Sequence, residues 1–161
     1  MPGIEIKVDD TKAIAKITKL PIAVRDNLRS LLPDIVRTLG LSVEDKLDRE
    51  LKSRGRLHVK KQMIENPKSI SGAVSIVADP GPALLPQWLE YGTRPHLIEA
   101  RFAKALSFYW EKLGQRVVFH SVHHPGTQAY QFLERSLDEM RVDVIDEIER
   151  AVRSAAQRVA A

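Results

Sequence analysis

Three histidines lie close enough in the sequence to suggest chemistry. His120, His123 and His124 fall within five positions, and imidazole serves both as a metal ligand and as an acid or base near neutral pH. The surrounding letters VVFHSVHHPG alternate and end at Pro-Gly, which predicts a strand with His120 and His124 on one face, about 13 Å apart. Because zinc–nitrogen bonds are about 2.1 Å long, one ion cannot bind both rings. We therefore expect no metal site and no cofactor.

Other patterns that carry catalysis are missing from the sequence. It has no cysteine, which excludes thiolate nucleophiles, thiolate metal sites and disulfides, and which is usual for a protein made in a reducing compartment. It has no G-x-S-x-G motif and no glycine-rich phosphate-binding motif. His96 follows Pro95 and is interpreted as a hydrogen-bond donor at a strand edge. We expect no enzyme, and a histidine-dependent nuclease remains an alternative hypothesis.

Basic residues gather in one stretch, KSRGRLHVKK at residues 52–61. The chain as a whole has 25 basic and 21 acidic residues, so the formal charge of +4 is mild. The stretch is either a solvated helix end and strand or a surface for DNA or an acidic partner. The candidate charged interface consists of Arg54, Arg56, Lys60 and Lys61. In an assembly with a channel, we expect it to face a neighbouring subunit or the outer wall, not the channel, and to pair with acids such as Asp138, Glu139, Asp143 and Glu147.

A strand and a long helix are expected in the N-terminal part of the chain. Residues 4–8, IEIKV, alternate between apolar and polar, which predicts a half-buried strand. Between residues 14 and 51, apolar residues recur in steps of three, four or seven, which predicts a long helical arm. Pro21 is expected to restart this helix. Pro33 lies inside the pattern and is expected to kink or break it.

Strand and turn signals dominate the middle of the chain. The expected elements are a hairpin at 58–65 and 72–79, a short helix at 86–91 ending at Gly92 as a left-handed cap, an extended stretch at 96–100 and a second hairpin at 104–124. The letters DPGPALLP break regular structure just before the short helix. Leu84 and Leu85 in this loop are either cover for the core or contacts for a partner.

The last segment predicts a second long helix, because apolar residues between 133 and 159 advance by three or four. The expected fold is α+β, with an antiparallel sheet of four to five strands packed with a long N-terminal helical arm and a long C-terminal helix. A length of 161 residues fits a single domain, residues 1–161. No stretch approaches the ~20 apolar residues of a membrane span, and the first ten residues lack a signal-peptide pattern. We therefore expect a soluble protein of cytoplasmic origin, without a membrane partner.

Two stretches, residues 88–108 and 123–137, each contain Gly-Thr, a proline and a histidine. Their pieces occur in this order: WLEYGT at 88–93, Pro95 with His96 and Ile98, AKAL from Ala103 with Phe108, HPGT at 124–127, and Phe132 with Leu133. This order resembles the small tail-component family of long-tailed bacteriophages, the neck and tail-completion proteins also found in prophages and gene transfer agents. Residues 83–139 carry the resemblance. Ala100 and Gln131 stand where such proteins often have proline, which we interpret as drift at turn positions.

The resemblance implies a structural virion protein without enzymatic activity, in a single tail-completion-like domain. Its expected role is to join DNA-filled heads to tails, as a homo-oligomeric ring of six subunits in the neck or tail, assembled in the host cytoplasm. The expected partners are other copies of itself, head-completion or connector proteins, and tail terminator or tail tube proteins, with DNA passing through without specific binding. Two alternatives remain, a tail terminator that caps the tail tube and a basic regulator that binds nucleic acid through residues 52–61.

The same motifs supply the candidate interface. Pro95 and the pair Pro125–Gly126 predict rigid corners between elements. Four aromatic residues, Trp88, Tyr91, Tyr109 and Trp110, are either core residues or interface anchors. The motif and candidate interface residues are Leu84, Leu85, Trp88, Glu90, Tyr91, Gly92, Thr93, Pro95, His96, His124, Pro125, Gly126, Thr127 and Phe132.

Overall fold

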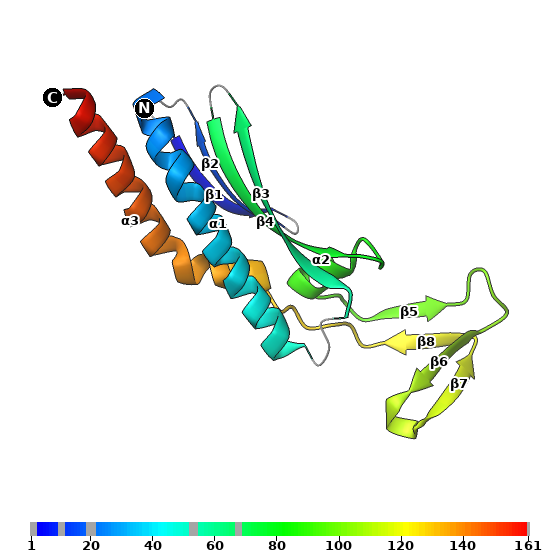
Figure 1. Ribbon diagram of the computed structural model, residues 1–161. Helices are drawn as coiled ribbons and strands as arrows, with labels where there is room; N and C mark the ends of the chain where they lie inside the picture. The colour runs from blue at the N-terminus through cyan, green and yellow to red at the C-terminus, as the bar shows by residue number, and fades with distance from the viewer. Residues whose placement is uncertain (1–2, 10–11, 19–21, 52–54, 67–68, 161) are drawn as a thin grey trace.

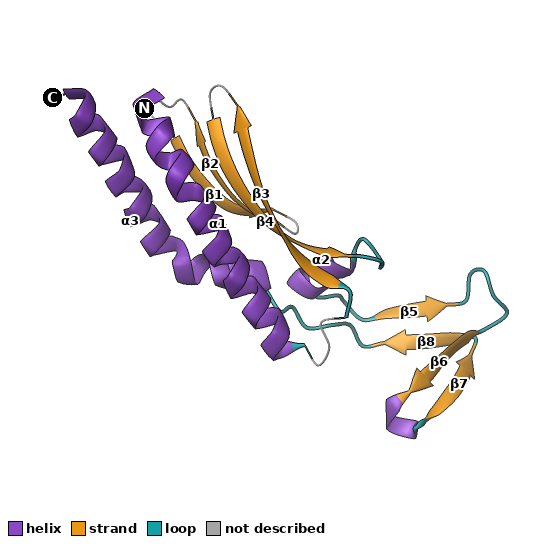
Figure 2. Ribbon diagram, viewed as in Figure 1, coloured by secondary structure: helices purple, strands orange, loops and turns teal. Residues whose placement is uncertain are grey.

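The computed structural model describes residues 3–9, 12–18, 22–51, 55–66 and 69–160. Its elements in chain order are β1 (Gly3–Asp9), β2 (Lys12–Thr18), α1 (Ile22–Glu50), β3 (Leu57–Asn66), β4 (Ser69–Ala78), α2 (Leu85–Tyr91), β5 (His96–Glu99), β6 (Leu106–Trp110), a 3-10 turn (Glu111–Leu113), β7 (Gln115–Phe119), β8 (Ser121–His124) and α3 (Phe132–Ala160). Figures 1 and 2 show this α+β arrangement, which confirms the fold class expected from the sequence.

The strands are divided among three antiparallel sheets, not collected in one. Four strands form the main sheet in the order β1-β2-β4-β3, while β5 pairs with β8 and β6 pairs with β7. The four strands of the main sheet fit the expected number, but the strands after residue 95 lie outside this sheet. Both edges of β4 are already paired, with β2 and β3, and the chain then leaves the sheet through a turn and α2. The later strands therefore pair only with one another.

The N-terminal helical arm is shorter than the sequence pattern predicted. Residues 12–18 form strand β2, which pairs with β4 in the register Lys12↔Ser75 to Thr18↔Ser69. In such a short segment, KAIAKIT fits a period of two as well as helical spacing, and pairing with β4 selects the strand. The expected restart at Pro21 lies outside the described residues. Helix α1 runs without interruption past the exposed Pro33, so the predicted break was wrong.

The rest of the predicted elements are found close to their expected positions. The strand at β1, the hairpin of β3 and β4, the short helix α2, the extended β5, the hairpin turn between β6 and β7, and the long helix α3 are all confirmed. Gly92 ends α2 with φ of 71° and ψ of −178°, so it is not the left-handed cap that was expected. Its positive φ nevertheless favours glycine.

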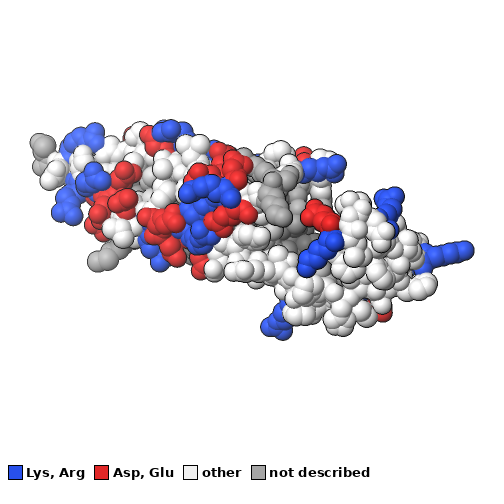
Figure 3. Space-filling view, turned by 90° about the horizontal axis from the view of Figure 1, so that it is seen from below, with Lys and Arg blue, Asp and Glu red and all other residues white. Residues whose placement is uncertain are grey.

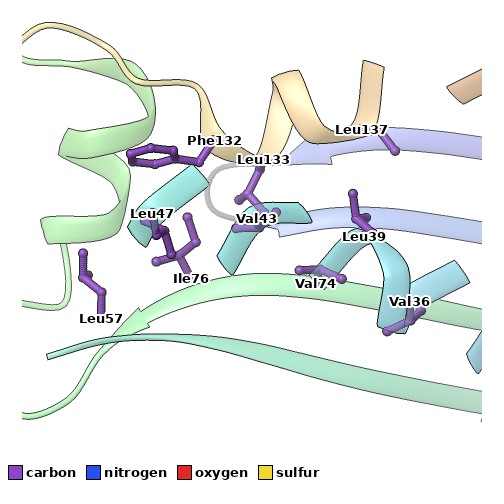
Figure 4. Packing of buried hydrophobic residues seen from close by; sticks show 10 residues of the cluster. All are labelled: Val36, Leu39, Val43, Leu47, Leu57, Val74, Ile76, Phe132, Leu133 and Leu137. Atoms are coloured by element: carbon purple, nitrogen blue, oxygen red, sulfur yellow. The ribbon is translucent and has the colours of Figure 1, made fainter. Parts of the chain in front are cut away.

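The core lies between the main sheet and a layer of two helices. Helices α1 and α3 lie side by side on one face of the main sheet (Figure 1). Figure 4 shows one part of the core, where Phe132 and Leu133 at the start of α3 meet Val43 and Leu47 of α1 above Ile76 of β4. Fully burying an aliphatic or aromatic side chain of this size contributes about 1.5–3 kcal/mol. This packing fixes the first turn of α3 beside the sheet.

A second region projects away from this core. Residues 96–124, here called the β-arm, comprise β5 to β8 and extend from the end of α2 (Figure 1). The predicted single strand VVFHSVHHPG is broken at His120, where β7 ends and β8 begins to pair with β5. The expected arrangement of His120 and His124 on one strand face is not found, because His120 is a bend residue between β7 and β8.

Candidate functional site

The two motif segments of the sequence meet and cross at the base of the β-arm. Thr93 and Thr127 form an isolated antiparallel bridge, in which each backbone N–H donates to the other residue's carbonyl, at 2.9 and 3.1 Å. The Thr127 N–H also donates to the Thr93 hydroxyl oxygen at 2.9 Å. These bonds hold together two parts of the chain that are 34 residues apart.

Glycine permits the close approach at this crossing. A Cβ atom at Gly92 would lie 2.5 Å from the Thr127 carbonyl oxygen and 2.9 Å from the Ala129 nitrogen. A Cβ atom at Gly126 would overlap the Thr93 carbonyl oxygen and lie 3.0 Å from the Arg94 carbonyl carbon. Both glycines also have positive φ. The Gly-Thr pairs that are shared by the two motifs are thus explained by the contact between their backbones.

Glu90 forms the second element of this corner, by capping α3. Its carboxylate is almost fully buried and accepts hydrogen bonds from the backbone N–H groups of Leu133, at 3.1 and 3.2 Å, and Glu134, at 3.0 Å. The first N–H groups of a helix have no partner within the helix, and an acidic group placed there also interacts favourably with the helix dipole. Glu90 therefore joins α2 to the start of α3.

The pKa of the Glu90 carboxyl is raised, chiefly because burial disfavours its charged form. Hydrogen bonds from the backbone N–H groups at the start of α3 act in the opposite direction and favour the carboxylate. The cap is thus a buried acid whose charge is only partly compensated. Its hydrogen-bond partners among the described residues are the backbone amides of Leu133 and Glu134.

Gln131 explains one departure of the sequence from the phage family pattern. Its φ is 53°, a left-handed value that proline cannot adopt, since the proline ring holds φ near −65°. Its N–H donates to the carbonyl oxygen of Glu90 at 3.2 Å, and its own carbonyl accepts from Arg135 at 2.9 Å. A proline would remove the first of these bonds. This backbone therefore excludes proline at position 131, which is a more specific reason than drift at a turn.

His96 and His124 are cross-strand neighbours at the base of the β-arm. Their ring centroids are 5.1 Å apart. The Gly126 N–H donates to Nδ1 of His124 at 3.1 Å, while Nδ1 of His96 lies 2.8 Å from the Arg94 carbonyl oxygen and must be its donor. Each ring is thus held by the backbone of its own corner. Among the described residues, no hydroxyl or carboxylate is bonded to either ring and no metal-binding group of three or more His, Cys, Asp or Glu is present.

A groove of about 570 Å³ lies beside the crossing. It is lined by Trp88, Thr93, Arg94, Pro95, His96, Ile98, His124 and Thr127. The indole of Trp88 is 42% exposed at this groove. The lining is mostly apolar with a few polar atoms, a composition found in ligand-binding clefts.

The remaining motif residues divide between core and surface. Phe132 is fully buried and stacks on Tyr130, with ring centroids 5.1 Å apart. Leu85 packs against the core, whereas its neighbour Leu84 is 53% exposed. The two leucines therefore do not share one role. Pro125 and Tyr91 are exposed.

The candidate charged residues do not form one surface. Lys61 lies over α1 and pairs with Glu44 at 3.1 Å, and Arg56 donates to the Pro80 carbonyl oxygen at 3.1 Å. Lys60 is exposed and directly precedes Lys61 in β3, so its side chain lies on the opposite face of the sheet from that of Lys61. Arg54 lies outside the described residues. Glu139, an expected partner on another subunit, accepts a hydrogen bond from Lys46 of its own chain at 2.5 Å.

Two features of the site were not found from the sequence. The capping role of Glu90 was missed because its partners follow it by more than 40 residues, and only the Glu within WLEYGT signalled it. The projection of the β-arm from the core was not predicted, because the sequence left its aromatic residues as either core residues or interface anchors. The core interpretation of Trp88, Tyr91, Tyr109 and Trp110 was wrong, since all four are exposed.

No family model, curated protein or solved structure matches this chain. None of the helices in the described part of the chain is long and apolar enough to cross a membrane.

Proposed function

We propose that this protein is a structural subunit of a bacteriophage virion, located at the head–tail junction and needed to join DNA-filled heads to tails. The observation that carries the proposal is the β-arm, which exposes a cluster of large apolar side chains away from the core. Such surfaces are characteristic of protein–protein interaction. The order of motifs in residues 83–139 supplies the phage context.

The corner between the motifs supports this role, because it sets the direction in which the β-arm leaves the body. The Thr93–Thr127 bridge, the two glycines and the Glu90 cap together tie α2, the β-arm and α3 at one place. A subunit of a ring needs such a rigid base, since a small change of angle at one contact accumulates around the ring. The motif residues thus support assembly through the backbone more than through exposed side chains.

The alternative function within the phage tail is that of a tail terminator, which caps the tail tube. Both roles require self-association, and they differ in the partner found on each side of the ring. DNA binding has weaker support, because two of the candidate basic residues are engaged within the chain, Lys61 by Glu44 and Arg56 by the Pro80 carbonyl. A regulator would bind duplex DNA with an affinity that falls steeply with salt.

The test is deletion of the gene from the phage or prophage that encodes the chain, with mass spectrometry of purified particles. We expect the protein in mature particles, and we expect the deletion to leave filled heads and finished tails that do not join. Expression of the wild-type chain should restore joining. Absence of the protein from particles together with normal joining in the deletion strain would reject the proposal. Joined particles with tails of irregular length would instead favour the terminator role.

A further inference from the structure

The β-arm lacks a core of its own. None of the residues from 91 to 131 is buried, although the segment contains four strands. Half of the exposed large apolar residues in the described part of the chain lie in the β-arm, namely Leu97, Ile98, Phe102, Tyr109, Trp110, Leu113, Val118 and Phe119. Isolated two-stranded sheets are only marginally stable in water, and contiguous exposed apolar surface indicates a partner. The β-arm therefore has a surface that a second protein must cover.

One face of the hairpin β6–β7 is aromatic. The rings of Phe108, Trp110 and Phe119 lie on the same face, with centroids 6.1 to 6.4 Å apart. The opposite face carries Tyr109 and Val118 together with polar neighbours. Clustered aromatic residues dominate the binding energy of interfaces because they bury large areas at a low cost in side-chain entropy. We therefore expect a partner of the β-arm to bind this aromatic face.

Charge decides which partner surface this face can meet. The β-arm contains four basic and two acidic residues, a net charge of +2, so two β-arms would repel one another. Residues 132–149 of α3 contain seven acidic and two basic residues, a net charge of −5. Figure 3 shows a largely uncharged surface with outlying basic groups on the β-arm, whereas acidic and basic groups are intermixed on the helical body.

Helix α3 also offers an apolar contact within this acidic region. Val142 is 68% exposed and has Asp138 and Asp146 one helical turn away on either side. Among the described residues, no ion pair engages Asp143, Asp146, Glu147 or Glu149. These four acidic side chains are thus available to a basic partner, whereas Asp138 pairs with Arg141 at 3.9 Å.

We propose that the aromatic face of the β-arm docks on the region around Val142 of α3 in a second copy of this chain. The contact joins two different surfaces, so each copy can bind one neighbour through its β-arm and another through its α3. Repetition of such a contact gives a ring if the rotation closes and a filament if it does not. The inference rests on the proposed function, because it names the surfaces through which subunits of that ring join.

The first test is the oligomeric state of the purified full chain, measured by sedimentation velocity and native mass spectrometry over a range of concentrations. We expect a wild-type oligomer whose association weakens by about thirtyfold or more in Trp110→Ser/Phe119→Ser, the size of effect typical of interface hot spots. The matched control is Val118→Ser on the opposite face of the same hairpin, which should associate as the wild type does. Thermal unfolding should show that both variants keep the folded helical body. A wild-type chain that is monomeric at every concentration, or equal effects of the two variants, would overturn the inference.

Charge reversal tests the pairing of the two surfaces. Lys104→Glu/Lys112→Glu in the β-arm and Asp143→Lys/Asp146→Lys in α3 should each weaken association. The chain with all four substitutions should recover it, because opposite charges again face each other. If reversal in the β-arm alone strengthens association, then the β-arms contact one another and the inference fails.

Particle analysis separates this inference from the proposed function. If the chain forms the oligomer that depends on the β-arm but is absent from particles, the contact stands and the virion role is rejected. If the chain is present in particles while its oligomer survives Trp110→Ser/Phe119→Ser, the virion role stands and this contact is rejected.

Discussion

At the scale of single residues, Glu90 is the side chain on which the corner most depends. Replacement by Ala removes the cap of α3 and should lower the free energy of unfolding by at least about 1–2 kcal/mol. Replacement by Gln should cost less, because its oxygen can still accept from Leu133 and Glu134. Urea denaturation monitored by circular dichroism measures both losses. Equal stability of wild type and Glu90→Ala would contradict the capping role.

The pH dependence of the Glu90→Gln comparison gives a second measurement. Since the pKa of Glu90 is raised in the folded chain, the unfolded chain releases its proton first as pH rises. The stability contributed by Glu90 is therefore fully present below its unfolded pKa and decreases as pH rises through the folded pKa. Because Gln does not titrate, the free energy of unfolding of the wild type should fall relative to that of Glu90→Gln as the pH is raised from 4 to 8. A constant difference would show that burial does not disfavour the carboxylate.

Gly126 tests the crossing of the two backbones. Gly126→Ala places a Cβ on the Thr93 carbonyl oxygen in a residue whose φ is 90°. Gly114→Ala is the matched control, because Gly114 also has positive φ but a Cβ there meets no atom within 4 Å. The control should cost about 1 kcal/mol from backbone strain, and Gly126→Ala should cost a further 1–3 kcal/mol from overlap. Equal losses of stability in thermal melts of Gly126→Ala and Gly114→Ala would mean that the two crossing backbone segments can separate without cost.

At the scale of elements, two adjacent leucines before and at the start of α2 have different environments. Leu85 packs against the core, so Leu85→Ser should lower the free energy of unfolding by about 1–2 kcal/mol. Leu84 is mostly exposed, so Leu84→Ser should change stability by less than about 0.5 kcal/mol. Denaturant titration of the two single variants measures this difference, and joining of heads to tails tests whether Leu84 contacts a partner. A large loss of stability in Leu84→Ser would place that side chain in the core.

The contact between α1 and α3 contains one buried cation. The Lys46 side chain is almost fully buried and bonds to Glu139 at 2.5 Å and to the Ser42 hydroxyl at 3.1 Å. Glu139→Gln should destabilise the chain, because the ammonium group then stays buried without its counter-charge. Lys46→Met should be less harmful than Glu139→Gln, since it removes the charge itself. Chemical denaturation measures the loss of stability in each variant. A larger loss in Lys46→Met than in Glu139→Gln would contradict this explanation.

At the scale of the whole molecule, four ion pairs among the described residues join α1 to its neighbours. Lys46–Glu139 and Glu50–Arg135 connect α1 to α3, and Arg29–Glu65 and Lys61–Glu44 connect it to β3. The hydrogen bond from the basic partner lowers the pKa of Glu50, Glu65 and Glu139. Their stabilising contribution is therefore present above the ordinary glutamate pKa and is lost as pH falls through the lower, folded values. We expect the free energy of unfolding to fall steeply below pH 4.5, and less steeply in Glu50→Gln/Glu65→Gln/Glu139→Gln. Equal acid sensitivity of this triple variant and the wild type would contradict the lowered pKa of these three glutamates.

The sequence by itself determined the local elements and the places where the chain turns. Apolar spacing predicted α3 and most of α1, alternation predicted β1, strand and turn signals predicted the β3–β4 hairpin, and Gly and Pro marked the corners. These features depend on contacts between near neighbours in the chain, which periodicity and turn chemistry describe well. The phage role remains a proposal, since it comes from the order of short motifs.

Only the tertiary structure decided how these elements pair and what the motif residues do. KAIAKIT could be helix or strand until pairing with β4 selected the strand, and the later strands were left to form the β-arm because β4 had no free edge. Glu90, Gly92 and Gly126 act on residues far away in the sequence, through a carboxylate cap and backbone contact. The exposure of the β-arm has the same origin. An aromatic residue is core or surface according to what packs over it, and in the β-arm nothing from the described part of this chain buries these residues.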